Sequence, residues 1–161
     1  MITIRRVEHR DFPRIVEMTR ALAAYLKAAA VPKITEDVLL REGPFGKDRL
    51  RIIVAEQNET LVGFCLYTFG FSGRRGTCGL FIEDLYVEPE MRGTGLGKKL
   101  LATAAEFEQD NHIGFMKLEA SLSNETAVQF YRKSGFYFFE DDIFMMLEAQ
   151  DMIKLRDQFH P

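Results

Sequence analysis

The sequence predicts an α/β fold in which one mixed central sheet of about seven strands is flanked by about four helices. Three observations lead to this prediction. Short apolar runs of β-forming residues crowd the middle of the chain, longer runs carry apolar residues every three or four positions, and two of these helical runs join neighbouring strands. No repeat, low-complexity tract or linker interrupts the chain, so we expect residues 1–161 to form a single domain.

The first half of the chain is predicted to hold one strand, two helices and a hairpin. Residues 2–7 alternate apolar and polar side chains, as in a half-buried strand. Residues 11–29 place apolar side chains at helical spacing, and a shorter helix is expected over residues 35–41. The β-rich runs 51–56 and 60–69 are separated by Gln-Asn-Glu, which indicates a hairpin.

The second half alternates strands with helices and then ends in a further hairpin. Apolar β-rich runs, helical spacing and closing Pro or Gly residues define the elements. The expected order is a strand at 80–87, a helix at 95–109, a strand at 115–121, a helix at 124–134, a hairpin of 136–139 with 143–147, and a polar helical tail at 148–159.

The composition excludes several classes of protein. Hydrophobic residues make up 47% of the 161-residue chain and charged residues 28%, which is typical of a folded globular protein. No run approaches the ~20 apolar residues of a membrane helix, and the N-terminus lacks a signal-peptide pattern. With two cysteines and a net charge of −3, we expect a cytoplasmic protein that does not act on nucleic acid. The three histidines lack metal-ligand spacing, so no metal is expected.

A glycine-rich loop, residues 92–99 (RGTGLGKK), follows the strand at 80–87 and opens the next helix. Glycines let the backbone approach a ligand closely, and free N–H groups at a helix start bind anions. The loop lacks the spacing of a P-loop and the third glycine of the dinucleotide fingerprint. It fits the pattern Arg-x-x-Gly-x-Gly through Arg92, Gly95 and Gly97, so we expect it to bind a phosphate or pyrophosphate.

Two long motifs resemble those of one enzyme family. Residues 83–97 (EDLYVEPEMRGTGLG) resemble the acetyl-coenzyme A binding motif of the GNAT family of N-acetyltransferases. Residues 124–136 (NETAVQFYRKSGF) resemble that family's second motif, Asn-x-x-Ala-x-x-Phe-Tyr-x-x-x-Gly-Phe. The order of the other elements also fits, so the resemblance covers nearly the whole chain and implies the GNAT fold. Residues 62–69, Gly76 and residues 81–87 look most like the diamine and thialysine N-acetyltransferase group.

The resemblance implies acetyl transfer from acetyl-CoA, as co-substrate, to a primary amine of a small, cationic substrate such as a diamine, a polyamine or a lysine-like molecule. The amine would attack the thioester directly in a ternary complex. The residues implied to contact the coenzyme are Leu85, Tyr86, Val87, Arg92, Gly93, Thr94, Gly95, Leu96, Gly97, Lys98, Asn124, Ala127 and Tyr131. A homodimer is implied only by analogy with the group's members.

The resemblance also implies roles in the chemistry. Tyr131 matches the tyrosine that protonates the leaving thiolate, although a packed helix residue is the alternative. A backbone N–H near Leu85, on a strand that splays from its neighbour, would polarise the thioester carbonyl. Glu83 is the candidate general base, through a water, or a ligand for the cationic amine, and strand alternation would place Asp84 on the other face. Glu119, on the adjacent strand, is a second candidate cation ligand.

Two other functions stay open at this point. A protein or peptide N-acetyltransferase would share the coenzyme residues and differ in having an open acceptor groove. A non-catalytic module that binds acetyl-CoA would need the glycine loop but neither Tyr131 nor Glu83. No motif in the chain identifies the amine that is acetylated.

Overall fold

The computed structural model describes residues 1–139 and 145–158 of the chain. The chain falls into two compact units, Met1–Val128 and Gln129–Pro161. Residues 140–144, in the middle of the expected C-terminal hairpin, and residues 159–161 lie outside the described part.

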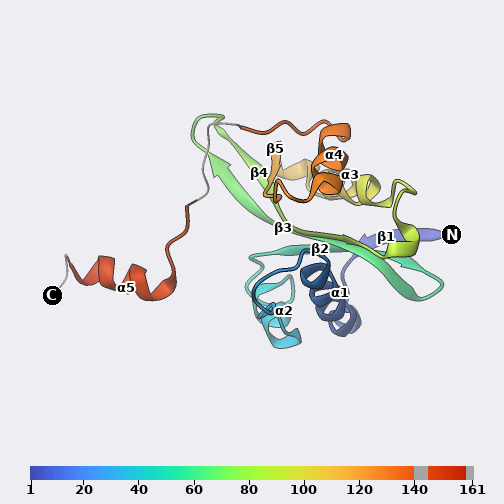
Figure 1. Cartoon of the computed structure of the whole chain (residues 1–161), viewed down its shortest axis with the longest axis horizontal. Coiled ribbons are helices and arrows are strands. Elements are labelled where there is room, and N and C mark those ends of the chain that lie inside the picture. The colour runs from blue at the N-terminus through green and yellow to red at the C-terminus, as the bar shows by residue number, and fades with distance from the viewer. Residues whose placement is uncertain (140–144, 159–161) are drawn as a thin grey trace. The chain divides into compact units, whose positions relative to one another are not determined.

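The first unit is built on one mixed sheet of five strands (Figure 1). The strands are β1 (Ile2–Arg6), β2 (Arg51–Gln57), β3 (Thr60–Ser72), β4 (Thr77–Val87) and β5 (Ile113–Leu118). They lie in the order β1-β2-β3-β4-β5, and every pair is antiparallel except β4–β5, which is parallel. A parallel pair needs a crossover connection, and the helix α3 (Leu96–Phe107) lies in this connection.

Helices cover both faces of this sheet (Figure 1). The helices α1 (Phe12–Tyr25) and α2 (Glu36–Glu42) lie on one face, and α3 lies on the other. The buried residues of α1 are Phe12, Ile15, Val16, Met18 and Thr19. The helical spacing predicted Ile15 and Met18 among them, but it also extended the helix to residue 29, whereas α1 ends at Tyr25 and the side chains of Tyr25 and Leu26 are exposed. Thr35 caps α2, because its hydroxyl oxygen accepts the N–H of Val38 at 3.2 Å. Three short 3-10 helices complete the unit: η1 (His9–Asp11), η2 (Pro89–Met91) and η3 (Gln109–Asn111).

The main apolar core lies between the sheet and the pair α1–α2. Its members include Ile15 and Met18 of α1, Leu39 of α2, Ile52 and Val54 of β2, Phe64 and Leu66 of β3, and Tyr86 of β4. These strand residues are two positions apart, as expected for side chains that share one face of a strand. The intervening residues Ile53 and Cys65, which are paired across β2 and β3, are also fully buried, so the centre of the sheet is covered on both faces.

The C-terminal part of the chain departs from the predicted hairpin. The helix α4 (Glu125–Lys133) begins in the first unit and ends in the second, and α5 (Ala149–Asp157) confirms the predicted helical tail. The strands expected at 136–139 and 143–147 are absent from the described residues 136–139 and 145–147. Their large apolar side chains are exposed, among them Tyr137, Phe139 and Met146. A hairpin needs a packed face to be stable, and these runs have the composition of strands without that burial.

The fold class is therefore confirmed, whereas the strand count is corrected. The described residues form a mixed sheet of five strands and not the about seven that the apolar runs indicated. The five α-helices of the described residues include the four expected ones and the tail.

Candidate active site

The glycine loop joins the end of β4 to the start of α3. The turn η2 leads into it, and the hydroxyl of Thr94 donates to the carbonyl oxygen of Met91 at 2.7 Å. Gly93 and Gly95 have φ angles of +76° and +87°, in the left-handed region that residues with a Cβ rarely adopt. Open space surrounds both positions where a Cβ would lie, so the glycines are needed for the backbone turn itself.

The helix α3 begins without a side-chain cap. Its N-cap residue is Gly95, which has no side chain that could accept the first N–H groups of the helix. These N–H groups and the positive end of the helix dipole favour an anion. Lys98 and Lys99 are exposed in the first turn, which contains no acidic residue. This end of α3 is therefore suited to phosphate groups, and their binding there stays a prediction.

The strand β4 loses its neighbour on one side before it ends. Its pairing with β5 stops at Ile82 and Leu118, whereas its pairing with β3 continues to Val87, opposite Gly63. The segment Glu83–Val87 thus has a paired strand on only one side among the described strands. A splayed strand of this kind is what the resemblance implies beside the coenzyme, because backbone N–H groups outside a ladder can serve as oxyanion donors.

A β-bulge in β4 changes the expected alternation of its side chains. Leu66 of β3 lies opposite Asp84, but the next residue, Tyr67, lies opposite Ile82, so Glu83 is an extra residue in β4. The hydroxyl of Thr68 donates to Oε1 of Glu83 at 3.1 Å. Leu66 and Thr68 share one face of β3. Asp84 pairs with Leu66, and the side chain of Glu83 accepts the hydroxyl of Thr68, so both carboxylates lie toward that face. The expectation that Asp84 points to the opposite face was wrong, because alternation holds only in a strand without a bulge.

The two adjacent carboxylates have different surroundings. Glu83 is exposed, whereas Asp84 is half-buried on the face of the sheet that α1 and α2 cover. Burial raises the pKa of Asp84 from 3.8 to about 6, and the neighbouring charge of Glu83 adds to this increase. A carboxylate with a raised pKa is a frequent feature of active sites. Sequence reasoning missed Asp84, because no residue type in the sequence marked the bulge.

Glu119 lies just beyond the strand on which it was expected, and Asn124 lies directly before its helix. Glu119 is exposed and follows directly after β5, which ends at Leu118. Asn124 precedes α4, and its side-chain Oδ1 accepts the N–H of Ala127 at 3.2 Å. This capping bond is the structural role expected of an asparagine there. A contact with the coenzyme remains a prediction for both Asn124 and Ala127.

Tyr131 lies in the second unit, in the C-terminal half of α4. Its ring makes edge contacts with the ring of Phe130, at a centroid distance of 5.0 Å, and with that of Phe136, at 5.5 Å. Both partners belong to the same unit. The role of Tyr131 as the general acid that protonates the coenzyme sulfur therefore stays a prediction from the motif.

Arg92 is not a freely solvated charge. Its Nε donates to the carbonyl oxygen of Val87 at 3.0 Å, and its guanidinium lies over the rings of Tyr25 and Tyr86 at 4.5 Å and 5.9 Å from their centroids. The phenolic hydroxyl of Tyr86 in turn donates to Glu88 at 2.9 Å. The guanidinium is thus held at the end of β4, where the glycine loop begins.

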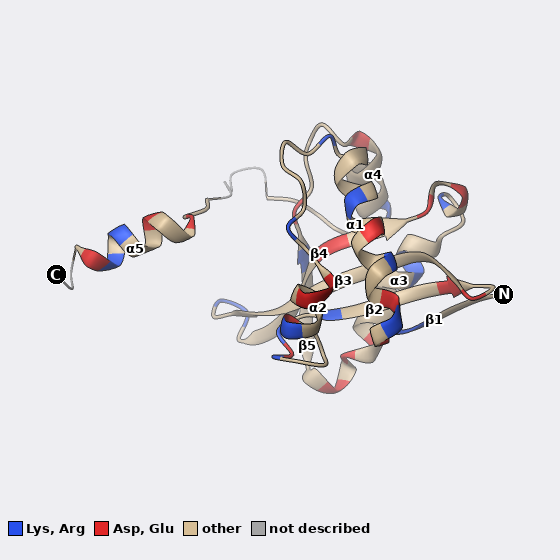
Figure 2. Ribbon diagram, turned by 90° about the horizontal axis from the view of Figure 1, so that it is seen from below, with Lys and Arg blue, Asp and Glu red and all other residues tan. Residues whose placement is uncertain are grey.

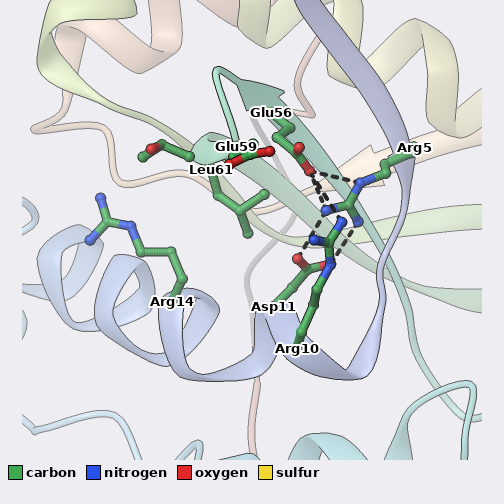
Figure 3. Close-up of a pocket in the computed structure, with 8 residues that line it drawn as sticks. Arg5, Arg10, Asp11, Arg14, Glu56, Glu59 and Leu61 are labelled. Atoms are coloured by element: carbon green, nitrogen blue, oxygen red, sulfur yellow. Dashed lines mark hydrogen bonds and ion pairs between the residues drawn. The ribbon is translucent and has the colours of Figure 1, made fainter.

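A cavity of about 270 Å³ lies beside β1, η1 and the turn between β2 and β3 (Figure 3). Arg5 is its central residue: it donates to Asp11 at 2.7 Å and forms an ion pair with Glu56. None of the predicted site residues lines this cavity. Because Arg5 of β1 is paired with Asp11 of η1 and with Glu56 of β2, this cluster stabilises the packing of these three elements against one another. Acidic and basic residues are likewise interspersed over the rest of the first unit (Figure 2).

Residues 1–139 and 145–158 contain neither a candidate metal centre nor a candidate membrane-spanning helix. Within these ranges, no group of three or more His, Cys, Asp or Glu side chains could hold a metal ion. No helix in the same ranges is long and apolar enough to cross a membrane. Cys65 is buried in the sheet, where burial raises the pKa of its thiol to about 12, so it is a poor nucleophile.

Comparison with known proteins gives consistent matches over most of the chain. The model of the acetyltransferase (GNAT) family matches residues 12–136. Thialysine N-epsilon-acetyltransferase of Sus scrofa is 34% identical over 143 residues, which cover 83% of this chain and 83% of the relative. Peptidyl-lysine N-acetyltransferase YjaB of Salmonella typhimurium is 30% identical over 142 residues, which cover 84% of this chain and 83% of the relative.

Solved structures show the same fold. An integron cassette protein from the mobile metagenome of V. cholerae matches with a TM-score of 0.75 and 23% sequence identity. The match covers 96% of this chain and 97% of that protein. At this level of identity the likeness concerns the fold alone.

Proposed function

This chain belongs to the acetyltransferase (GNAT) family, and we propose that it transfers the acetyl group of acetyl-CoA to a primary amine of a small, cationic substrate. The family makes the chain an acetyl-CoA-dependent acyltransferase. The substrate class, the direct attack of the amine in a ternary complex and the roles of individual residues are our proposal.

One observation carries the choice of a cationic substrate: Glu83 and Asp84 lie on the same face of β4, at the bulge that precedes the splayed segment. Two neighbouring carboxylates create a negative potential that attracts ammonium groups. Glu83 is exposed and can meet a solute, whereas Asp84 is half-buried behind it. Glu119, just after β5, would extend the acidic character toward the neighbouring strand.

The coenzyme is proposed to follow the end of β4 into the glycine loop. Leu85, Tyr86 and Val87 would line its pantetheine arm, and a backbone N–H near Leu85 would polarise the thioester carbonyl. The pyrophosphate would meet Arg92, Lys98 and the N–H groups of the loop residues Gly93, Thr94, Gly95, Leu96 and Gly97. The left-handed glycines and the uncapped start of α3 support this placement. Asn124 and Ala127 would complete the contacts.

The proposed chemistry needs three proton transfers. A lysine-like amine arrives protonated, because its pKa is about 10.4. Glu83 takes one proton from the ammonium group through a water, and the freed nitrogen forms a bond to the thioester carbonyl carbon while the carbon–sulfur bond breaks. Tyr131 gives its phenolic proton to the leaving sulfur and regains one as the amide nitrogen loses its second proton.

A peptide substrate is the second candidate. It is favoured by the relative named as a peptidyl-lysine N-acetyltransferase, which is 30% identical over most of both chains. A free lysine-like molecule and a lysine side chain present the same ammonium group, so the two candidates share the acidic pair. The two candidate substrates differ in the charge and size of the rest of the molecule to which the amine is attached.

Release of the coenzyme thiol tests these possibilities. Wild-type protein is mixed with acetyl-CoA and, in turn, with diamines, polyamines, lysine analogues, neutral and acidic amino acids, and lysine-containing peptides. We expect the highest kcat/KM with a small dicationic or lysine-like amine. Faster turnover of peptides would favour the second candidate, and tight binding of acetyl-CoA by calorimetry without turnover of any amine would indicate a non-catalytic module.

We further propose, by analogy with the family, that the protein acts in the cytoplasm as a homodimer. Sedimentation equilibrium at micromolar concentration tests the second part. A mass of two chains is expected, and a mass of one chain at all concentrations would contradict it.

A further inference from the structure

Tyr25 and Arg92 are linked across two elements that are far apart in the sequence. Tyr25 is the last residue of α1, and the guanidinium of Arg92 lies 4.5 Å from the centroid of its ring. Arg92 also donates to the carbonyl oxygen of Val87, at 3.0 Å. A long, exposed arginine loses rotamer entropy when it is fixed, so contacts that fix it in advance lower the cost of binding a ligand.

The helix α1 is connected to the same segment at a second point. Arg14, in its N-terminal half, forms an ion pair with Glu88, and Glu88 also accepts the hydroxyl of Tyr86 at 2.9 Å. Arg14 and Tyr25 are roughly three helical turns apart. The ion pair of Arg14 and the ring contact of Tyr25 therefore connect α1 to this segment at two points. These contacts give the Tyr25 ring a defined position next to the glycine loop.

We propose that Tyr25 is a positioning residue for the coenzyme: its ring holds the guanidinium of Arg92 at the start of the glycine loop, ready for the pyrophosphate. This inference rests on the proposed function, in which Arg92 contacts that group. Tyr25 itself touches neither the reacting carbonyl nor the amine. Nothing in the coenzyme motif of residues 83–97 points to Tyr25, because it lies 58 residues before the motif begins.

The contact depends on the aromatic face and not on the phenolic hydroxyl. A cation over a ring is attracted by the ring's quadrupole, which phenylalanine retains and an aliphatic side chain lacks. Tyr25→Phe should therefore behave like wild type, whereas Tyr25→Leu should lose the contact. Tyr25 is half-exposed at the end of its helix, so both substitutions are compatible with the fold. Tyr25→Met serves as a second aliphatic variant if Tyr25→Leu does not fold.

The experiment compares two thioesters with one amine substrate. With acetyl-CoA, Tyr25→Leu should raise KM about two- to fivefold, the range of an exposed cation–π contact, and leave kcat unchanged. With acetyl-pantetheine, which lacks the pyrophosphate, Tyr25→Leu and wild type should have the same KM. Tyr25→Phe should match wild type with both thioesters. Circular dichroism and thermal unfolding establish that each variant is folded.

A double-mutant cycle separates this inference from the proposed function. Arg92→Ala should raise KM for acetyl-CoA, and adding Tyr25→Leu to Arg92→Ala should raise it no further. The inference is overturned if Tyr25→Leu has no effect on KM for acetyl-CoA, or affects both thioesters equally, while Arg92→Ala still weakens binding. If Arg92→Ala has no effect either, the assignment of Arg92 to the pyrophosphate fails, and the inference fails with it.

Discussion

Glu83 and Asp84 are consecutive in β4, yet their side chains share one face of the sheet. The register shift opposite Leu66 and Tyr67 inserts Glu83 as an extra residue, and the hydroxyl of Thr68 holds its Oε1 at 3.1 Å. A bulge is a common device for redirecting a side chain at a site. Here it brings together an exposed carboxylate and a half-buried one at the point where β4 leaves β5.

Asp84 should make the stability of the protein depend on pH. Its folded pKa is raised from 3.8 to about 6, so between these values the folded state binds more protons than the unfolded state. Stability should therefore fall as the pH rises from about 4 to about 6 and stay level above that range. Asp84→Asn should remove this slope and raise the free energy of unfolding at pH 7 by about 2–3 kcal/mol. Urea unfolding at pH 4, 5 and 7 measures both effects.

A slope that survives in Asp84→Asn would assign the titration to another group. Glu83→Gln is the matched control, because Glu83 is exposed and its removal should leave most of the slope in place. If Asp84→Asn instead lowers stability at pH 7, the half-buried carboxylate has a stabilising partner, and its pKa is not raised.

Thr68 should contribute to kcat/KM for a cationic amine through its hydrogen bond to Glu83. Thr68→Val keeps the shape of the side chain but removes the donor, and Thr68→Ser keeps the donor. A hydrogen bond of this kind contributes about 0.5–1.5 kcal/mol. Thr68→Val should therefore lower kcat/KM for a cationic amine about two- to tenfold, while Thr68→Ser stays near wild type. Steady-state kinetics at a saturating acetyl-CoA concentration measure the difference, and equal activities of the two variants would contradict a role for this bond.

Gly95 should be sensitive both to a side chain and to a negative charge. Its φ of +87° disfavours any residue with a Cβ, at a cost of roughly 1–2 kcal/mol. Gly95→Ala carries only this cost, whereas Gly95→Glu adds a carboxylate beside the expected pyrophosphate. We expect Gly95→Glu to abolish binding of acetyl-CoA and Gly95→Ala to weaken it. Calorimetric titration of folded variants checks this, and unchanged affinity in Gly95→Glu would refute the pyrophosphate assignment.

Tyr131 is expected to act on turnover and not on affinity. Loss of a general acid typically lowers the rate by about 10²–10⁴-fold. Tyr131→Phe keeps the ring that contacts Phe130 and Phe136, so the packing within its unit should persist. Its kcat should fall while its dissociation constant for acetyl-CoA stays near that of wild type. Wild-type turnover in Tyr131→Phe would mean that a water or another group protonates the thiolate.

Much of the first unit could be predicted because its signals are local. Alternation predicted β1, helical spacing predicted α1, and turn residues between two β-rich runs predicted the hairpin of β2 and β3. The helical spacing extended α1 to residue 29, beyond its end at Tyr25. The glycine loop was predictable for the same reason, since its residues are consecutive. The aromatic run at 136–139 was misassigned, because a β-forming composition becomes a strand only where a partner edge and a packed face exist.

The parts of the site that were missed depend on contacts between distant residues. The bulge at Glu83 results from the register between β3 and β4, and no residue type in either strand predicts it. The contact of Tyr25 with Arg92 joins residues from α1 and from the loop before α3. Both features arise only when the sheet and the helices have been packed together.

The preference for substrate charge, and its dependence on Glu83, tests the central claim most directly. The measurement is kcat/KM for a diamine, a neutral amine and an acidic amino acid of similar size, in wild type and in Glu83→Gln, over pH 6–9. Wild type should prefer the dication. Glu83→Gln should raise KM for the dication and shift the rising limb of the pH profile to higher pH, because the site loses both a cation ligand and a base. Faster turnover of the acidic amino acid than of the diamine, or an unchanged preference in Glu83→Gln, would contradict the account.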